Sequence, residues 1–163
     1  MKTLYIVRHA KSSWADMTMQ DIDRPLNKRG KKDAPFISSK CVELEYIPEL
    51  IITSNAKRAQ ETADYFIRKF DLSDSQTQVN GKLYHAPEDT YFEEAQLIDD
   101  NVASVMMFGH NPGITYLANN ISKEYVDNVP TCGVLIIEST AIKWAEVEPT
   151  NCKLTNFIYP KLF

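Results

Sequence analysis

The sequence has few cysteines and few histidines, and this scarcity excludes several kinds of site. Its 163 residues include three cysteines, which are widely spaced and form no Cys-x-x-Cys pair. Neither a disulfide framework nor a thiolate zinc site is therefore indicated. The three histidines, His9, His85 and His110, lack the spacing of a histidine metal motif, and neighbouring arginines would repel a cation. We expect no metal, no other cofactor and a reduced, cytoplasmic location.

Long hydrophobic runs are also lacking. The apolar segment near the N-terminus is interrupted at Arg8, which leaves it too short for a signal peptide or a membrane span. The formal net charge of −4, from 18 basic and 22 acidic residues, argues against nonspecific nucleic-acid binding as the main task. No aromatic stacking motif for nucleic acid is present either. We therefore expect neither a membrane nor a nucleic acid as a partner.

Apolar strand-like runs alternate with helical patterns along the chain, which predicts a layered α/β fold. With 44% hydrophobic residues, a chain of this length forms one domain, residues 1–163, around its own core. The final two strands resemble a hairpin, so we expect a three-layer α/β/α sandwich whose mostly parallel sheet has an antiparallel edge. Strands are expected at residues 4–7, 50–53, 82–84, 104–108, 134–137 and 142–147, helices at 28–42, 56–70, 87–98 and 114–121, and a polar turn at 71–79.

Several of these strands end on residues suited to phosphate chemistry. Arg8 and His9 end the first strand, Ser54 follows the strand at 50–53 with Arg58 on the next helix, and His110 follows the strand at 104–108. Ligands of open α/β sheets bind outside the carboxyl ends of the strands. Guanidinium groups clamp a phosphoryl group bidentately, and imidazoles can attack phosphorus or donate to its oxygens. The pattern predicts one phosphate-handling site.

Each of these residues also has a purely structural interpretation. Arg8 and His9 could begin a solvated loop, Ser54 could cap a helix, and His110 could stabilise its Gly-His-Asn-Pro-Gly turn. Arg58 could lie on a solvated helix face, although its place near a helix N-terminus, whose free N–H groups favour anions, counts against this. The residues taken singly leave these alternatives open.

Taken together, three segments resemble the histidine phosphatase superfamily, also called the phosphoglycerate mutase-like family. They read YIVRHAKS at 5–12, TSNAKRAQETA at 53–63 and GHNP at 109–112, in the order and spacing of that family. The short chain, with DRPL at 23–26 and LYHA at 83–86, is most similar to the small bacterial phosphohistidine phosphatases. The resemblance covers nearly the whole chain.

This resemblance implies a phosphoglycerate mutase-like fold and a metal-independent phosphatase that forms a covalent phosphohistidine intermediate. It makes His9 the nucleophile, Arg8 and Arg58 the phosphate-binding arginines, and His110 the second imidazole, which donates to a phosphoryl oxygen. Arg24 resembles a residue that borders the pocket, although an exposed loop position fits nearly as well. Ser54 would add a hydroxyl to the phosphate site. Trp14, in the polar loop after the first strand, either lines the entrance or packs locally.

The general acid is the least defined part of the site. Many family members have a carboxylate near the segment that here contains His85 and Glu88. Glu88 could instead complement a helix dipole, and His85 could either protonate a leaving group or only line the rim. Phosphohistidine phosphatases of this kind can lack a carboxylic acid, because a phosphoramidate bond needs less assistance than an ester. We expect a phosphohistidine-containing protein as substrate, with a small phosphomonoester substrate or a non-catalytic phosphate-recognition module as alternatives.

Overall fold

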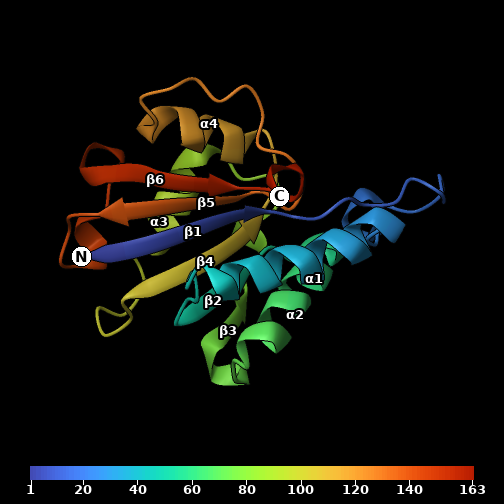
Figure 1. Cartoon of the computed structure of the whole chain (residues 1–163), viewed down its shortest axis with the longest axis horizontal. Coiled ribbons are helices and arrows are strands. Elements are labelled where there is room, and N and C mark those ends of the chain that lie inside the picture. The colour runs from blue at the N-terminus through green and yellow to red at the C-terminus, as the bar shows by residue number, and fades with distance from the viewer.

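The computed structural model describes residues 1–163 and contains one mixed six-stranded sheet (Figure 1). The strand order is β3-β2-β4-β1-β5-β6. The first four strands in this order are parallel, whereas β5 is antiparallel to β1 and β6 to β5. The expected antiparallel edge is therefore confirmed. The strands are β1 (Lys2–Arg8), β2 (Leu50–Thr53), β3 (Thr77–Val79), β4 (Ser104–Gly109), β5 (Val134–Ser139) and β6 (Cys152–Ile158).

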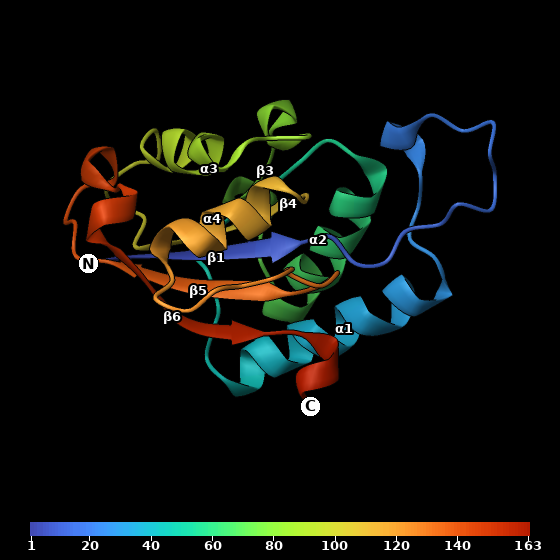
Figure 2. The same ribbon diagram turned by 90° about the horizontal axis from the view of Figure 1, so that it is seen from above.

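Two pairs of helices cover the sheet. In Figure 2, α3 (Glu88–Ala95) and α4 (Gly113–Ile121) lie above the strands, and α1 (Lys28–Glu43) lies below them. The helix α2 (Lys57–Phe70) shares the buried cluster of α1. Each face encloses its own buried apolar cluster, with 18 residues on the side of α1 and α2 and 20 on the side of α3 and α4. The three-layer α/β/α sandwich is thus confirmed. No helix is both long and apolar enough to cross a bilayer.

Most element boundaries agree with the sequence patterns. The helix α1 begins where Asn27 accepts a hydrogen bond from the Gly30 N–H at 2.9 Å, as expected for an N-cap residue. The strand at residues 50–53 is reproduced, and β4, α2 and α4 each differ from expectation by one residue at an end. The helix α3 is shorter than expected, because it ends at Ala95.

The strand expected at residues 82–84 is wrong. Gly81–Leu83 forms a 3-10 turn, which begins where the Asn80 side chain accepts from the Lys82 N–H at 3.0 Å. The third strand is instead β3, within the segment expected to be a polar turn. It pairs only with β2 at the edge of the sheet. An edge strand can remain polar, so it lacks the apolar pattern that marks a central strand.

The strand expected at residues 142–147 is also wrong. Trp144–Glu146 forms a 3-10 turn, and the fully buried Trp144 donates its indole N–H to the Val102 carbonyl at 2.7 Å. The apolar residues here reflect burial in a turn and not strand pairing. The partner of β5 is β6, further along the chain, where exposed and partly buried residues are mixed.

Candidate active site

The parallel strands bring three polar residues to one edge of the sheet. In the ladder, Arg8 lies opposite Gly109 and Thr53 lies opposite Phe108. The residues that follow these strands, His9, Ser54 and His110, therefore lie at the same carboxyl edge. Together with the neighbouring loops they form a pocket of about 250 Å³, which is lined by Arg8, His9, Lys11, Ser12, Trp14, Asp21, Arg24, Arg58, His85, His110, Asn111 and Thr131.

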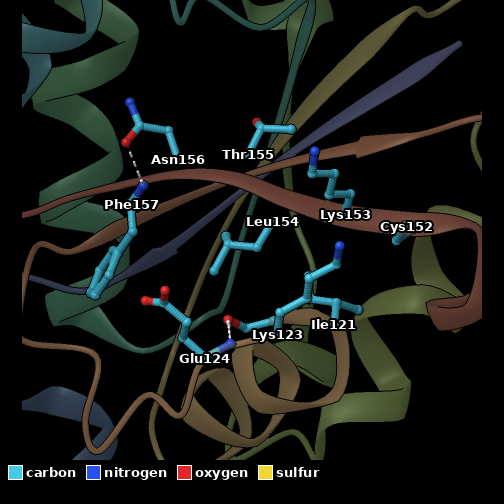
Figure 3. Close-up of a pocket in the computed structure, with 10 residues that line it drawn as sticks. Ile121, Lys123, Glu124, Cys152, Lys153, Leu154, Thr155, Asn156 and Phe157 are labelled. Carbon is cyan, nitrogen blue, oxygen red and sulfur yellow. Dashed lines mark hydrogen bonds between the residues drawn. The ribbon is translucent and has the colours of Figure 1, made fainter.

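A larger hollow of about 480 Å³ lies elsewhere, between the end of α4 and the edge strand β6 (Figure 3). Its lining includes Ile121, Leu154 and Phe157 but no histidine or arginine. Size alone would favour this hollow over the smaller pocket. The groups that can bind and attack a phosphoryl group are, however, concentrated in the smaller pocket, which is the candidate active site.

His9 is held in a neutral form with a lone pair on one ring nitrogen. Its side chain is buried, and Nδ1 lies 2.7 Å from the Ala10 carbonyl oxygen. Since a carbonyl can only accept, Nδ1 carries the hydrogen and Nε2 keeps a lone pair. Burial lowers the pKa of His9 from 6.5 to about 3; the Ala10 hydrogen bond opposes this shift, and the charges of Arg58, Arg8 and Arg24 add to it. At neutral pH, His9 therefore has the nucleophilic form of an imidazole.

Arg58 links the two imidazoles to an acidic loop residue. Its Nε donates to His9 Nε2 at 3.4 Å, and its Nη2 lies 3.4 Å from His110 Nδ1. The same guanidinium donates to the Asp21 carbonyl at 2.7 Å and forms an ion pair with the Asp21 carboxylate at 3.0 Å. The Arg58 side chain is only 3% exposed. The alternative of a solvated helix face is therefore wrong for Arg58.

His110 is oriented by Ser54. A guanidinium only donates, so His110 Nδ1 accepts from Arg58 and Nε2–H donates to Ser54 Oγ at 2.8 Å. Ser54 Oγ also accepts from the Ala56 N–H at 3.2 Å, so this hydroxyl contacts both the helix start and the site. Burial, followed by the charges of His9 and Arg58, lowers the pKa of His110 to about 2.

Gly109 allows the turn that places His110. The His110 N–H donates to the Tyr91 hydroxyl at 3.2 Å. A Cβ on Gly109 would lie 2.0 Å from the same hydroxyl oxygen. Only a glycine permits this approach, because Tyr91 is completely buried and cannot move aside freely.

Two further arginines contribute to the pocket. Arg8 donates to the Val129 carbonyl at 2.8 Å, while its buried Nε has no hydrogen-bond partner. An anion bound in the pocket would provide the missing acceptor. Arg24 is buried, bonds Ser12 Oγ at 2.8 Å, and stacks on the Trp14 ring with its guanidinium carbon 3.5 Å from the ring centroid. An exposed loop position is therefore excluded for Arg24, and Trp14 lines the entrance.

The carboxylate in the pocket belongs to Asp21, which the sequence did not single out. Its Oδ2 accepts from the Tyr84 hydroxyl and from Arg58, and lies 3.4 Å from His85 Nε2. Partial burial would raise the pKa of Asp21, but the Tyr84 hydrogen bond and the Arg58 guanidinium hold it well below its usual range. Asp21 is therefore ionised at neutral pH. The only feature of the sequence that could have identified Asp21 is its position three residues before Arg24, with which it forms an ion pair at 3.1 Å.

The two candidate acids lie in different surroundings. His85 lines the rim of the pocket with its side chain 58% exposed, and its φ of 52° is unusual for a residue other than glycine. Glu88 is absent from the pocket lining and lies in the first turn of α3, where a carboxylate complements the helix dipole. No group of three or more histidine, cysteine or acidic side chains is arranged to hold a metal ion.

Comparison with known proteins agrees with this geometry. A model of the histidine phosphatase superfamily (branch 1) matches residues 4–80. A structure from Agrobacterium tumefaciens, assigned as the phosphohistidine phosphatase SixA, is 27% identical with a TM-score of 0.82 over 98% of both chains. Both matches indicate the histidine phosphatase superfamily, and the structural match indicates its SixA type. These similarities support a phosphatase.

Two further proteins are similar to this chain over nearly its whole length. The protein histidine phosphatase SixA, solved in complex with tungstate, has a TM-score of 0.81 at 19% identity over 98% of both chains. The expected phosphoglycerate mutase-like fold is thereby confirmed. An uncharacterized protein of Mycobacterium tuberculosis is 28% identical over 165 residues, which cover 95% of this chain and 100% of the relative.

Proposed function

We propose that this protein is a phosphohistidine phosphatase that acts on phosphorylated proteins through a phosphorylated His9, with residues 1–163 as one catalytic domain. The observation that carries the proposal is the state of Asp21. It is the one carboxylate that lines the pocket, and its surroundings keep it ionised. A catalytic pocket with a neutral nucleophile and no protonated carboxylic acid suits a substrate whose leaving group needs little acid assistance.

The leaving groups of the two substrate classes differ in this need. An alkoxide from a phosphomonoester must receive a proton as it leaves, and an ionised carboxylate cannot supply one. A phosphohistidine leaves as a neutral imidazole when its other ring nitrogen already carries a proton. The negative charge of Asp21 stabilises that cationic form of the substrate. The charge of Asp21 therefore favours a phosphoramidate over an ester.

In the first step, the phosphoryl group moves to His9. The lone pair of His9 Nε2 forms a bond to phosphorus as the bond from phosphorus to the substrate nitrogen breaks, and its electron pair returns to the substrate ring. Arg8 and Arg58 hold the phosphoryl oxygens by charge-assisted hydrogen bonds. His110 Nδ1 accepts from Arg58 and its Nε2–H donates to Ser54, so His110 and Ser54 position the guanidinium that binds the phosphoryl group.

In the second step, water replaces His9. The water oxygen bonds to phosphorus, the phosphorus bond to His9 Nε2 breaks, and the electron pair returns to the imidazole. The excess proton of the water remains on the phosphate or passes to solvent. His9 is regenerated with its hydrogen on Nδ1, where the Ala10 carbonyl accepts it. The same arginines hold the group in both steps, so no metal is required.

A comparison of substrates tests the function. We expect kcat/KM for a phosphohistidine peptide to exceed that for phosphoserine, sugar phosphates and other alkyl monoesters by about 100-fold or more, the scale of general acid assistance that the pocket does not give an ester. Equal or faster hydrolysis of a small monoester would instead assign the protein to small-molecule phosphatases. Phosphate binding without turnover of any substrate would identify a recognition module.

A further inference from the structure

A second, cationic groove lies beside the active site, along α1. It has a volume of about 580 Å³ and is lined by Arg29, Lys32, Asp33, Phe36, Pro160 and Lys161. The strand β6 runs in the same direction as β1, so the C-terminal turn lies at the carboxyl edge of the sheet, and Figure 2 shows it beside α1. Arg29 Nη2 donates to Thr131 Oγ1 at 3.5 Å, and Thr131 lines the active site. The groove and the active site are therefore adjacent.

Two of the three cations of this groove make no ion pair within the fold. The helix α1 starts with the sequence KRGKK at 28–32 and has no acidic residue in its first turn. Arg29 pairs with Asp33 at 3.3 Å, whereas Lys32 and Lys161 form no ion pair. A cation at the positive end of a helix dipole costs about 0.3–1 kcal/mol. Cations that lower the stability of a helix in this way are expected at sites where a bound anionic ligand offsets their positive charge.

The start of α1 is fixed against the active site. The Asn27 N–H donates to the Lys11 carbonyl at 2.9 Å, and Lys11 lines the active site. A Cβ on Gly30 would lie 2.2 Å from the same carbonyl oxygen, so the helix backbone packs directly on this segment. The helix backbone that carries Arg29 and Lys32 thus has a fixed position relative to the phosphate site, which lowers the entropic cost of binding a ligand that spans both.

The loop after β1 carries exposed apolar side chains, one of which, Trp14, also lines the active site. Trp14 is 63% exposed and Met17 is 82% exposed, on the loop that projects from the body of the protein in Figure 1. Tryptophan, methionine and arginine are enriched at protein interfaces. A small phosphorylated metabolite would not reach across such an entrance, whereas a protein surface would.

We propose that the groove of Arg29, Lys32 and Lys161 docks acidic side chains that flank the phosphohistidine of a protein substrate. This proposal rests on the proposed function. The protein carries a net charge of −4, so most of its surface repels an acidic partner, and this face attracts one. Such complementarity orients the encounter and raises its rate.

Three phosphohistidine peptides of equal length test the docking, with the residues around the phosphohistidine replaced by glutamate, glutamine or lysine. For the unaltered protein we expect kcat/KM to be highest for the glutamate peptide, by about tenfold over the lysine peptide, and this preference to disappear as NaCl rises from about 0.05 M to about 0.5 M. The double substitution Lys32→Glu with Lys161→Glu should remove the preference and leave turnover of the free amino acid phosphohistidine within about twofold.

A matched double substitution provides the control. Lys69 and Lys143 are exposed at the opposite edge of the sheet, and Lys69→Glu with Lys143→Glu changes the net charge equally. This control should keep the preference for the glutamate peptide.

Equal turnover of all three peptides by the unaltered protein would overturn the docking proposal but leave the phosphatase function intact. No turnover of any phosphohistidine substrate would instead overturn the function. Inhibition by a single-stranded oligonucleotide, but not by a glutamate-rich peptide, would assign the groove to nucleic acid.

Discussion

His9 is the residue on which the proposed chemistry depends most directly. Because its Nε2 keeps a lone pair and its neighbours are cations, we expect brief exposure to a labelled phosphohistidine substrate to leave acid-labile phosphate on the protein. The variant His9→Ala should take up no label and should lose turnover by at least about 1,000-fold, since the covalent route is removed. Near-normal turnover of His9→Ala would exclude this residue as the nucleophile. Binding of vanadate by the variant would show that its pocket is still formed.

Substitution of a second residue, Asp21, should affect phosphohistidine and phosphomonoester hydrolysis differently. The neutral variant Asp21→Asn keeps the size of the side chain but no longer stabilises a cationic imidazole. We expect kcat/KM for phosphohistidine to fall about tenfold, a loss typical of one charge-assisted contact. Hydrolysis of p-nitrophenyl phosphate should not fall, because its leaving group needs no proton and Arg58 loses a competing anion. A parallel loss with both substrates would show that Asp21 only positions Arg58.

At the scale of elements, His110 is positioned by the close approach of Gly109 on β4 to Tyr91 on α3. In Gly109→Ala, the new Cβ would meet the Tyr91 hydroxyl at 2.0 Å. We expect the free energy of unfolding to fall by about 1–3 kcal/mol, as for other overpacked cores, and turnover to fall with it. Adding Tyr91→Phe should restore part of the stability, because the nearest atom is removed. Urea unfolding and kcat measure both effects.

A second glycine, Gly81, provides a comparison for the stability cost of Gly109→Ala. At Gly81, an added Cβ would first meet the end of the flexible Asn55 side chain, at 3.3 Å. Gly81→Ala should therefore cost much less than Gly109→Ala. Equal stability of the two variants would contradict the proposed role of the close approach between β4 and α3.

For the whole molecule, the buried histidines predict acid sensitivity. The pKa of His9 falls to about 3 and that of His110 to about 2 in the folded protein, from 6.5 in both cases. Between these values and pH 6.5 the unfolded chain binds more protons, so the free energy of unfolding falls as the pH decreases. The stabilisation is complete above about pH 6.5 and is lost progressively below it.

Urea unfolding at a series of pH values measures this dependence. His110→Gln removes one of the two groups, so its free energy of unfolding should change less steeply with pH in this window, by up to about 1.4 kcal/mol per pH unit. The carboxylate Asp21 contributes only at lower pH, because its unfolded pKa is near 3.8. Identical slopes for the variant and the unaltered protein would show that His110 is not the source of the acid sensitivity.

The sequence alone predicted the elements whose patterns are local. Strands β1, β2 and β4 are apolar runs buried on both faces, and α1 has a recognisable cap at Asn27. The ends of these strands also indicated Arg8, His9 and His110 as neighbours, because parallel strands share one carboxyl edge. The roles assigned to these residues in catalysis remain predictions, but their meeting in one pocket followed from sequence order.

Tertiary structure decided what local patterns could not express. Whether residues 142–147 formed a strand depended on the burial of Trp144 against Val102, far away in sequence. The pairing of Asp21 with Tyr84 and Arg58 likewise joins three separate segments, and no periodicity of a loop predicts such a contact. Burial and long-range charge fix the protonation states of the pocket, because both depend on which segments meet in space and not on their order in the chain.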